Sequence, residues 1–321
     1  MAEIGKDIAK AKQLLDAGLL VAIPTETVYG LAGNALSPHA VAGIFEAKNR
    51  PSFDPLIIHT SSIEKVEAYV LDFPEVLKKL ALKFWPGPLT LLLPRKNIIP
   101  DLVTSGLDRV AVRVPSHALT LELLESLDYP LAAPSANPFG YISPTTAQHV
   151  NAQLGERIPY ILDGGSCQVG LESTIVGIEN GDVTVYRLGG LDLSEIEGVV
   201  GPIKVRNHSS SNPQAPGLLE SHYAPRKPFV LGDLEILVPQ YLKQGKEIAV
   251  LSFQKYFDEL AKDFQIQLSP AGDIREAAQC LFSSMRKLDE SPAEVILTEL
   301  MPEKGLGRAI NDRLRRAAAQ G

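Results

Sequence analysis

The stretch L-L-V-A-I-P-T-E-T-V-Y-G-L at residues 19–31 begins as an apolar run and ends in a polar turn. The apolar part, residues 19–24, predicts a buried strand. Downstream, Ser37 and Pro38 supply an N-cap and a first-turn proline for a helix, and Pro51 ends that helix. The succession of strand, turn and helix indicates an α/β fold.

Beyond this stretch, extended and helical patterns continue to alternate through the first two hundred residues. Strands are expected at 55–59, 89–93, 109–115, 160–163, 173–176 and 182–187, and a helix at 74–84. Many strands with intervening turns favour a mixed sheet over a purely parallel one.

The composition changes at residues 206–227, which are rich in Ser, Pro and Asn and show neither periodicity. We interpret them as a linker. After it, strand patterns at 247–252 and 295–298 flank a helical pattern near 273–288. The sequence therefore predicts a first domain at 1–205, the linker at 206–227 and a smaller α/β domain at 228–321.

Composition limits the classes of function. The chain has 321 residues, 45% of them hydrophobic, and a net charge of −7. Overall acidity disfavours a protein that mainly coats nucleic acid, although a locally basic cleft stays open. With no signal peptide pattern and no apolar run of about 20 residues, we expect a cytoplasmic protein without membrane contact. Cys167 and Cys280 lie far apart without histidines at ligand spacing, so we assign neither a disulfide nor a metal ligand.

Common catalytic motifs are missing, among them the G-x-x-x-x-G-K-[ST] phosphate loop and the G-x-S-x-G elbow. Less common polar clusters remain, each with a purely structural alternative. The T-E-T of residues 25–27 could address a ligand from a strand end or satisfy the turn backbone. Lys48 and Arg50 could clamp phosphate oxygens or complement a helix dipole.

Three more clusters lie further along the chain. Arg109 and Arg113 share one face of the predicted strand and could bind an anion or face water. P-S-A-N at 134–137 could admit a ligand closely or form an ordinary turn. Ser173, within G-L-E-S-T-I-V-G, and Arg187, at the end of the next strand, could join the same polar surface.

Taken in order, P-T-E-T-V-Y-G-L, K-N-R-P, R-V-A-V-R-V-P, P-S-A-N and E-S-T-I-V resemble the YrdC-like family of threonylcarbamoyl-AMP synthases. S-H-Y-A-P at 221–225 and the terminal G-L-G-R-A-I-N-D-R-L-R-R-A look like the long, two-domain form. The resemblance implies a twisted mixed-sheet domain with a concave, positively charged cleft, a linker across that cleft, and a smaller Rossmann-like domain. Before H-Y-A-P the family usually carries a glycine, a lysine and an aromatic, whereas this chain reads P-G-L-L-E-S.

The resemblance also implies roles for individual residues. Those expected to form the catalytic, ATP-phosphate signature are Lys48, Arg50, Ser135 and Asn137. Other nucleotide-contacting positions are Asp54, Arg109, Ser143, Arg187 and Tyr223. The L-threonine pocket is expected to comprise Thr27, His59, Arg113, Ser173 and, through its backbone, Ala133.

The implied reaction condenses L-threonine, bicarbonate and ATP to threonylcarbamoyl-AMP and pyrophosphate. The product would serve formation of N6-threonylcarbamoyladenosine in tRNA that reads codons starting with A. Mg²⁺ is expected to accompany ATP, and the expected partner is the threonylcarbamoyl transferase machinery acting on tRNA. Two alternatives stay open: carbamoyl transfer to another acceptor, and a module that binds RNA weakly through a basic cleft.

Overall fold

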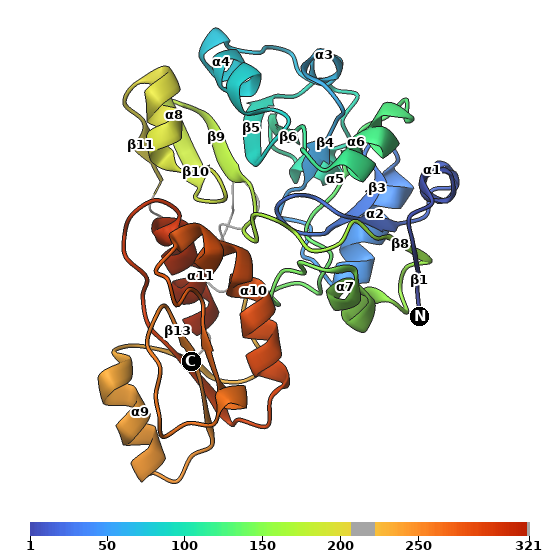
Figure 1. Ribbon diagram of the computed structural model, residues 1–321. Coiled ribbons are helices and arrows are strands. Elements are labelled where there is room, and N and C mark those ends of the chain that lie inside the picture. Colours follow the sequence, from blue (N-terminus) through green and yellow to red (C-terminus); the bar gives the residue numbers. More distant parts are fainter. Residues whose placement is uncertain (207–221, 320–321) are drawn as a thin grey trace.

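The computed structural model describes residues 1–206 and 222–319, which build two α/β units, each with its own sheet (Figure 1). The linker predicted at 206–227 falls partly on residues 207–221, outside the described residues. The two units pack against each other through helices of the second unit, coloured red in Figure 1.

The first unit is organised around a large mixed sheet, as the sequence predicts. In spatial order the described strands run β1-β8-β2-β3-β7-β4-β6-β5-β9-β10-β11. Their bounds are β1 (Glu3–Gly5), β2 (Val21–Ile23), β3 (Gly30–Asn34), β4 (Ile57–His59), β5 (Leu89–Pro94), β6 (Arg109–Arg113), β7 (Leu131–Ala132), β8 (Tyr160–Leu162), β9 (Thr174–Glu179), β10 (Asp182–Arg187) and β11 (Lys204–Val205). The sheet contains both parallel pairs, such as β4 and β6, and antiparallel pairs, such as β5 and β6.

Helices cover this sheet and connect its strands. Their bounds are α1 (Ile8–Asp16), α2 (Pro38–Lys48), α3 (Ile63–Val66), α4 (Glu75–Phe84), α5 (Asp101–Thr104), α6 (Ala118–Glu125), α7 (Ala147–Leu154) and α8 (Leu193–Val200). The helix expected at 74–84 is therefore present, as is the one that Ser37 and Pro38 predict.

The second unit is a small parallel sheet in the order β12-β15-β13-β14. Its elements are β12 (Phe229–Leu231), α9 (Leu234–Lys243), β13 (Ile248–Ser252), the 3-10 helix η1 (Lys262–Phe264), β14 (Gln265–Gln267), α10 (Ile274–Glu290), β15 (Val295–Thr298) and α11 (Gly307–Ala318). Parallel strands joined by helices are the Rossmann-like arrangement that the resemblance implies.

Strand β6 shows how the sequence pattern sets the two faces of the sheet. Val110, Val112 and Val114 all lie in the main hydrophobic core. Ala111 instead contacts a second apolar cluster on the opposite face. Because side chains alternate along a strand, Arg113 shares that opposite face, as predicted.

The end of α2 places a basic segment at the pocket described below. The Ser37 hydroxyl accepts a hydrogen bond from the Ala40 backbone N–H at 3.3 Å, and Asn49 ends the helix in the left-handed region with φ of 52°. This sharp reversal directs Lys48 inward and brings Arg50 to the start of the following loop.

The two units are in close contact at Gly170. A Cβ atom there would lie 2.5 Å from the carbonyl oxygen of Ala278 in α10, and the φ of Gly170 is +75°. Only glycine satisfies both conditions without strain. The first glycine of the G-L-E-S-T-I-V-G motif therefore lets α10 pack against the loop before β9.

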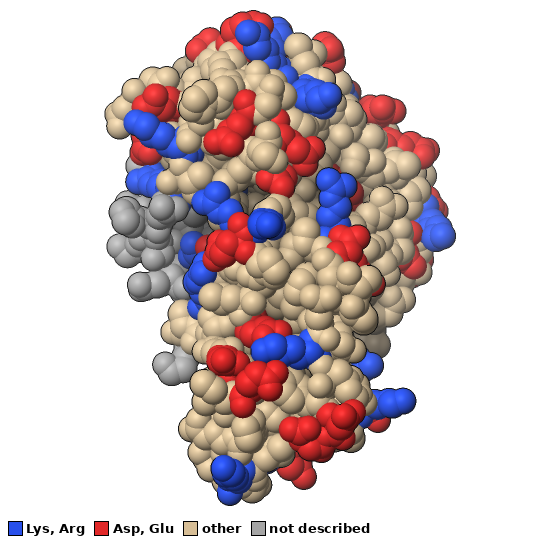
Figure 2. Space-filling model, turned by 60° about the vertical axis from the view of Figure 1, so that its left-hand side comes forward, with Lys and Arg blue, Asp and Glu red and all other residues tan. Residues whose placement is uncertain are grey.

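No helix among the described residues is long and apolar enough to cross a bilayer. On the face shown in Figure 2, basic and acidic side chains are interspersed over both units.

Candidate active site

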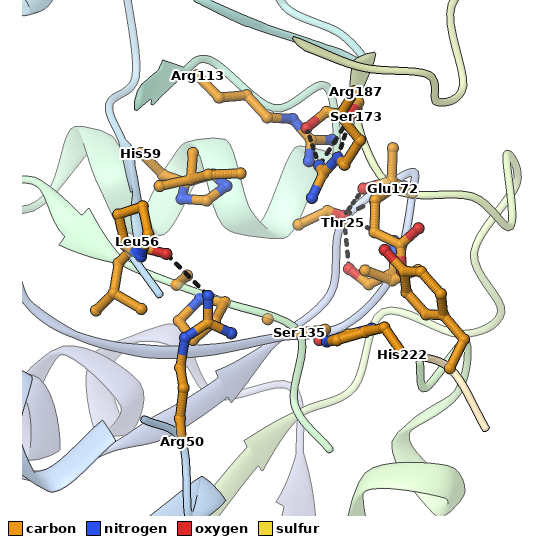
Figure 3. Close-up of a pocket in the computed structure, with 18 residues that line it drawn as sticks. Thr25, Arg50, Leu56, His59, Arg113, Ser135, Glu172, Ser173, Arg187 and His222 are labelled. Atoms are coloured by element: carbon orange, nitrogen blue, oxygen red, sulfur yellow. Dashed lines mark hydrogen bonds between the residues drawn. The ribbon is translucent and has the colours of Figure 1, made fainter. Parts of the chain in front are cut away.

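A pocket opens where several motifs meet at strand ends of the first unit (Figure 3). The predicted residues that line it are Thr27, Arg50, His59, Arg113, Ala133, Ser135, Ser173, Arg187 and Tyr223. They come from distant parts of the chain, and Tyr223 belongs to the segment predicted as the linker. The structure therefore brings together most of the residues that the resemblance assigns to ATP and L-threonine.

Arg113 lies at one end of the pocket, at the last position of β6. Its guanidinium donates to the Glu26 carboxylate at 2.7 Å and to the Gly87 carbonyl at 3.2 Å. The second oxygen of Glu26 accepts the Ser116 backbone N–H at 3.1 Å. Arg113 and Glu26 are both buried, so a fixed guanidinium faces the pocket from this end.

His59 is the neighbour of Arg113 across the parallel pair of β4 and β6. Burial, together with the positive charge of Arg113, lowers the pKa of His59 to about 3. The imidazole is therefore neutral near pH 7, and it adds a polar wall without adding a charge.

The T-E-T turn contributes to this end as well. The Thr25 hydroxyl donates to the Val28 carbonyl at 2.7 Å and lies 2.8 Å from the Thr27 hydroxyl. Both threonines line the pocket. The structural and the ligand-facing interpretations of this motif are thus compatible.

Arg50 and Arg187 supply two further cations. Arg50 is anchored by the Asp54 carboxylate at 3.0 Å and by the Pro55 carbonyl at 2.8 Å. Arg187 donates to the Ser173 carbonyl at 2.8 Å and to the Ser173 hydroxyl at 3.1 Å. In Figure 3 the Arg50 side chain extends from the side opposite Arg113 and Arg187.

Lys48 does not line the pocket, although it belongs to the same motif as Arg50. Its ammonium donates to the carbonyls of Ser135, at 2.6 Å, and Asn137, at 2.5 Å, and its exposed fraction is 1%. Burial, and then the charge of Arg50, lower the pKa of Lys48 well below its usual value. In this structure Lys48 fastens the P-S-A-N loop from behind.

The other predicted residues outside the pocket lining fall into two groups. Asp54, Asn137 and Ser143 are buried next to it, where they bond to residues of the site or its loops. Arg109 lies at the opposite end of β6 from Arg113 and donates to the Tyr186 hydroxyl at 2.9 Å. The structure does not bring Arg109 into the pocket lining.

Among the lining residues that were not predicted as site residues, three have polar side chains: Thr25, Glu172 and His222. Glu172 directly precedes Ser173, and an acid between Leu171 and the start of a buried strand was the available signal. His222 directly precedes Tyr223 and packs edge-on against it, with ring centroids 4.2 Å apart.

The pocket does not offer a metal cage made of protein alone. No group of three or more His, Cys, Asp or Glu side chains suited to a metal ion occurs within residues 1–206 and 222–319. The Glu172 carboxylate of the lining pairs with Arg313, and the Glu26 carboxylate next to the lining pairs with Arg113. The site therefore suits anionic ligands better than a free cation.

Family models match the chain along most of its length. The Sua5–YciO–YrdC family, whose model bears the description "Telomere recombination", matches residues 13–189. The C-terminal domain of threonylcarbamoyl-AMP synthase matches residues 191–319. That second match includes α8 and β11, although β11 pairs with β10 in the first sheet.

Curated relatives agree along nearly the full length. The threonylcarbamoyl-AMP synthase of Pyrococcus abyssi is 41% identical over 315 residues, which cover 94% of this chain and 91% of that protein. The synthase of Bacillus subtilis is 38% identical, with 97% and 92% covered.

Solved structures agree too. P. abyssi Sua5 in complex with L-threonine superposes with a TM-score of 0.93 at 39% identity, covering 99% of this chain and 97% of that one. Escherichia coli YciO, 18% identical with a TM-score of 0.53, shares the fold of the first unit.

Together with this fold, the relatives identify an enzyme of the nucleotidyltransferase class with a second α/β domain. The chain belongs to the threonylcarbamoyl-AMP synthase family, in its two-domain form.

Proposed function

We propose that the protein condenses L-threonine, bicarbonate and ATP to threonylcarbamoyl-AMP and pyrophosphate. The observation that carries the proposal is the convergence of three buried guanidinium groups, Arg50, Arg113 and Arg187, on one pocket. L-threonine carries a carboxylate and ATP carries a triphosphate. An array of three guanidinium groups can bind these negative groups at separate positions in the pocket.

Arg113 is the proposed partner of the threonine carboxylate. Its fork is already oriented by Glu26 and Gly87, so little side-chain freedom is lost when a carboxylate binds. Thr27 and neutral His59 lie nearby in the lining and would contact the rest of the amino acid. The complex of P. abyssi Sua5 with L-threonine supports threonine as the amino acid.

Arg50 and Arg187 are the proposed partners of the phosphates, together with the P-S-A-N loop that Lys48 holds. The threonine amine would condense with bicarbonate, with loss of one water molecule, to give a carbamate. A carbamate oxygen would then attack the α-phosphorus, and pyrophosphate would leave. Alignment and opposing cations suffice for this transfer, so no protein nucleophile is required.

Mg²⁺ is proposed to arrive with ATP, because the phosphate oxygens are the hard ligands that this ion prefers. It would neutralise part of the triphosphate charge. The side chains of Arg50, Arg187 and Ser135 would orient the nucleotide in the pocket.

The carbamate and the mixed anhydride both hydrolyse in water, so the site has to exclude solvent. His222 and Tyr223, in the last part of the segment predicted as the linker, line the pocket and are buried. They are suited to cover the intermediate. The product would pass to a cytoplasmic transferase that modifies tRNA.

A substrate panel tests the proposal. Purified protein is incubated with ATP, Mg²⁺, bicarbonate and one amino acid at a time, and pyrophosphate is measured. Release is expected with L-threonine, and serine and valine should support much less. Release without any amino acid, or RNA binding at physiological salt without ATP turnover, would instead favour another activity of this cleft.

A variant of Arg50 ties the activity to the pocket. Arg50→Gln removes a cation that opposes phosphate charge and is expected to lower kcat by about a hundredfold. Arg275→Gln, at an exposed position of α10, is the matched control and should keep full activity. Equal activity of the two variants would argue against the assigned phosphate site.

A further inference from the structure

One arginine of the C-terminal domain reaches the pocket of the first domain. Arg313 lies on α11 and has an exposed fraction of 0%. Its Nε donates to the Glu172 carboxylate at 3.0 Å, and its Nη2 donates to the Leu188 carbonyl at 2.8 Å. Asp312, its neighbour on the helix, accepts from Nη1 at 2.7 Å.

The carboxylate that Arg313 holds is part of the pocket wall. Glu172 lines the pocket, and its other oxygen accepts the Ser143 hydroxyl at 2.6 Å. Ser143 is in turn adjacent to the interdomain contact, because its carbonyl accepts a hydrogen bond from Arg286 of α10 at 3.3 Å. Glu172 therefore connects Arg313 of the C-terminal domain to Ser143 of the first domain.

Arg313 also contacts Tyr223, which lines the pocket. Its guanidinium carbon lies 5.1 Å from the ring centre of Tyr223. Phe282 of α10 also packs on Tyr223, with the two rings stacked at a centroid distance of 5.6 Å and an interplanar angle of 27°. Tyr223 adopts a φ of 66°, a strained value for a residue with a side chain, so its neighbours have to hold it in place.

We propose that Arg313 is a positioning residue for the adenylation step: it fixes Glu172 and Tyr223, and through them the nucleotide side of the pocket. Without its guanidinium, Glu172 would be a buried carboxylate without its main counter-charge, and it would turn toward Arg187 in the same lining. Arg187 would then be drawn away from the phosphates. The C-terminal domain is thus a working part of the site, an inference that rests on the proposed function.

The test compares Arg313→Met and Arg313→Lys with Arg315→Met. Arg315 lies on the same helix, but its side chain is 51% exposed and pairs with Glu303 on the surface. We expect Arg313→Met to lower kcat/KM for ATP by about a hundredfold. Arg313→Lys should recover part of the loss because it keeps the charge, and Arg315→Met should match the wild type.

Two readouts separate positioning from a general loss of structure. Threonine binding without ATP, measured by calorimetry, should change little in Arg313→Met, because the Arg113 end of the pocket is untouched. The double variant Glu172→Gln/Arg313→Met removes both charges, so it should be about tenfold faster than Arg313→Met alone while staying below the wild type.

The measurements distinguish failure of the proposed function from failure of the role of Arg313. If the wild type releases no threonine-dependent pyrophosphate, the proposed function fails. If the wild type is active and Arg313→Met equals it, the role of Arg313 is refuted. Loss of threonine binding in parallel with ATP kinetics, with no relief by Glu172→Gln, would refute positioning as well. Should Arg313→Met not fold, the double variant takes its place, and wild-type kinetics there would overturn the inference.

Discussion

Arg113 and Glu26 form a buried ion pair at 2.7 Å although they are 87 residues apart in the sequence. The pair joins the first and the third of the sequence motifs. Glu26 does not occupy all the hydrogen-bond donors of Arg113, because the guanidinium has five N–H groups and keeps some for a ligand. It sets the direction in which those donors point.

Replacing Arg113 by Lys keeps the charge but removes the fork. We expect the KM for L-threonine to rise by about ten- to a hundredfold, since a charge-assisted hydrogen bond is worth about 1.5–3 kcal/mol. The KM for ATP should stay within about twofold, and steady-state pyrophosphate release measures both constants.

Threonine amide is the internal control for Arg113→Lys. It lacks the carboxylate, so its weak turnover should be lowered far less by the substitution than that of threonine. If both amino compounds lose activity equally, Arg113 does not bind the carboxylate.

Lys48→Met is expected to lower the free energy of unfolding by about 2–4 kcal/mol, because two buried carbonyls, of Ser135 and Asn137, lose their donor. Turnover should fall as well, since the P-S-A-N loop is no longer fastened. Urea unfolding gives the first quantity and pyrophosphate release the second.

Lys83→Met provides the comparison. Lys83 also lies in the last turn of a helix, α4, but is exposed. It should change the free energy of unfolding by less than about 0.5 kcal/mol. A Lys48 variant as stable as the Lys83 variant would contradict the fastening role.

The two cysteines should differ in reactivity toward iodoacetamide. Burial raises the pKa of the Cys167 thiol to about 12, so it has almost no thiolate near pH 8. Cys280 is partly exposed. Mass spectrometry of the native protein should show alkylation of Cys280 alone, and both sites should react in denaturant; rapid native labelling of Cys167 would show that the T-E-T region opens.

Stability should fall as the pH drops below about 6.5. In the fold the pKa of His59 is about 3, whereas an unfolded histidine titrates near 6.5, so the unfolded state takes up the proton first. Stability from His59 is therefore complete above pH 6.5 and is lost toward pH 3. The slope from this one group approaches about 1.4 kcal/mol per pH unit.

His59→Asn isolates this contribution. Its urea unfolding free energy, followed between pH 7 and pH 4, should decline less steeply than that of the wild type. Identical slopes would mean that His59 takes up its proton over the same pH range in the folded and the unfolded state.

The sequence alone determined the α/β class, most strand and helix positions and the order of the motifs. These follow from local rules: β6 is recognisable because its valines alternate, and α2 because Ser37 and Pro38 start a helix and Pro51 stops it. The motif order also carried the family resemblance, and with it the residues now found around one pocket.

The contacts of each polar residue are visible only in the tertiary structure. Lys48 and Arg50 are two positions apart, yet the left-handed turn at Asn49 leaves one behind the P-S-A-N loop and the other in the pocket. Arg109 and Arg113 share a face of β6 but lie at its opposite ends. Arg109 therefore contacts Tyr186, whereas Arg113 lines the pocket. Arg313 reaches Glu172 across 141 positions of sequence. Periodicity describes one element at a time, whereas ion pairs of this kind depend on how elements pack, and that is settled by the whole fold.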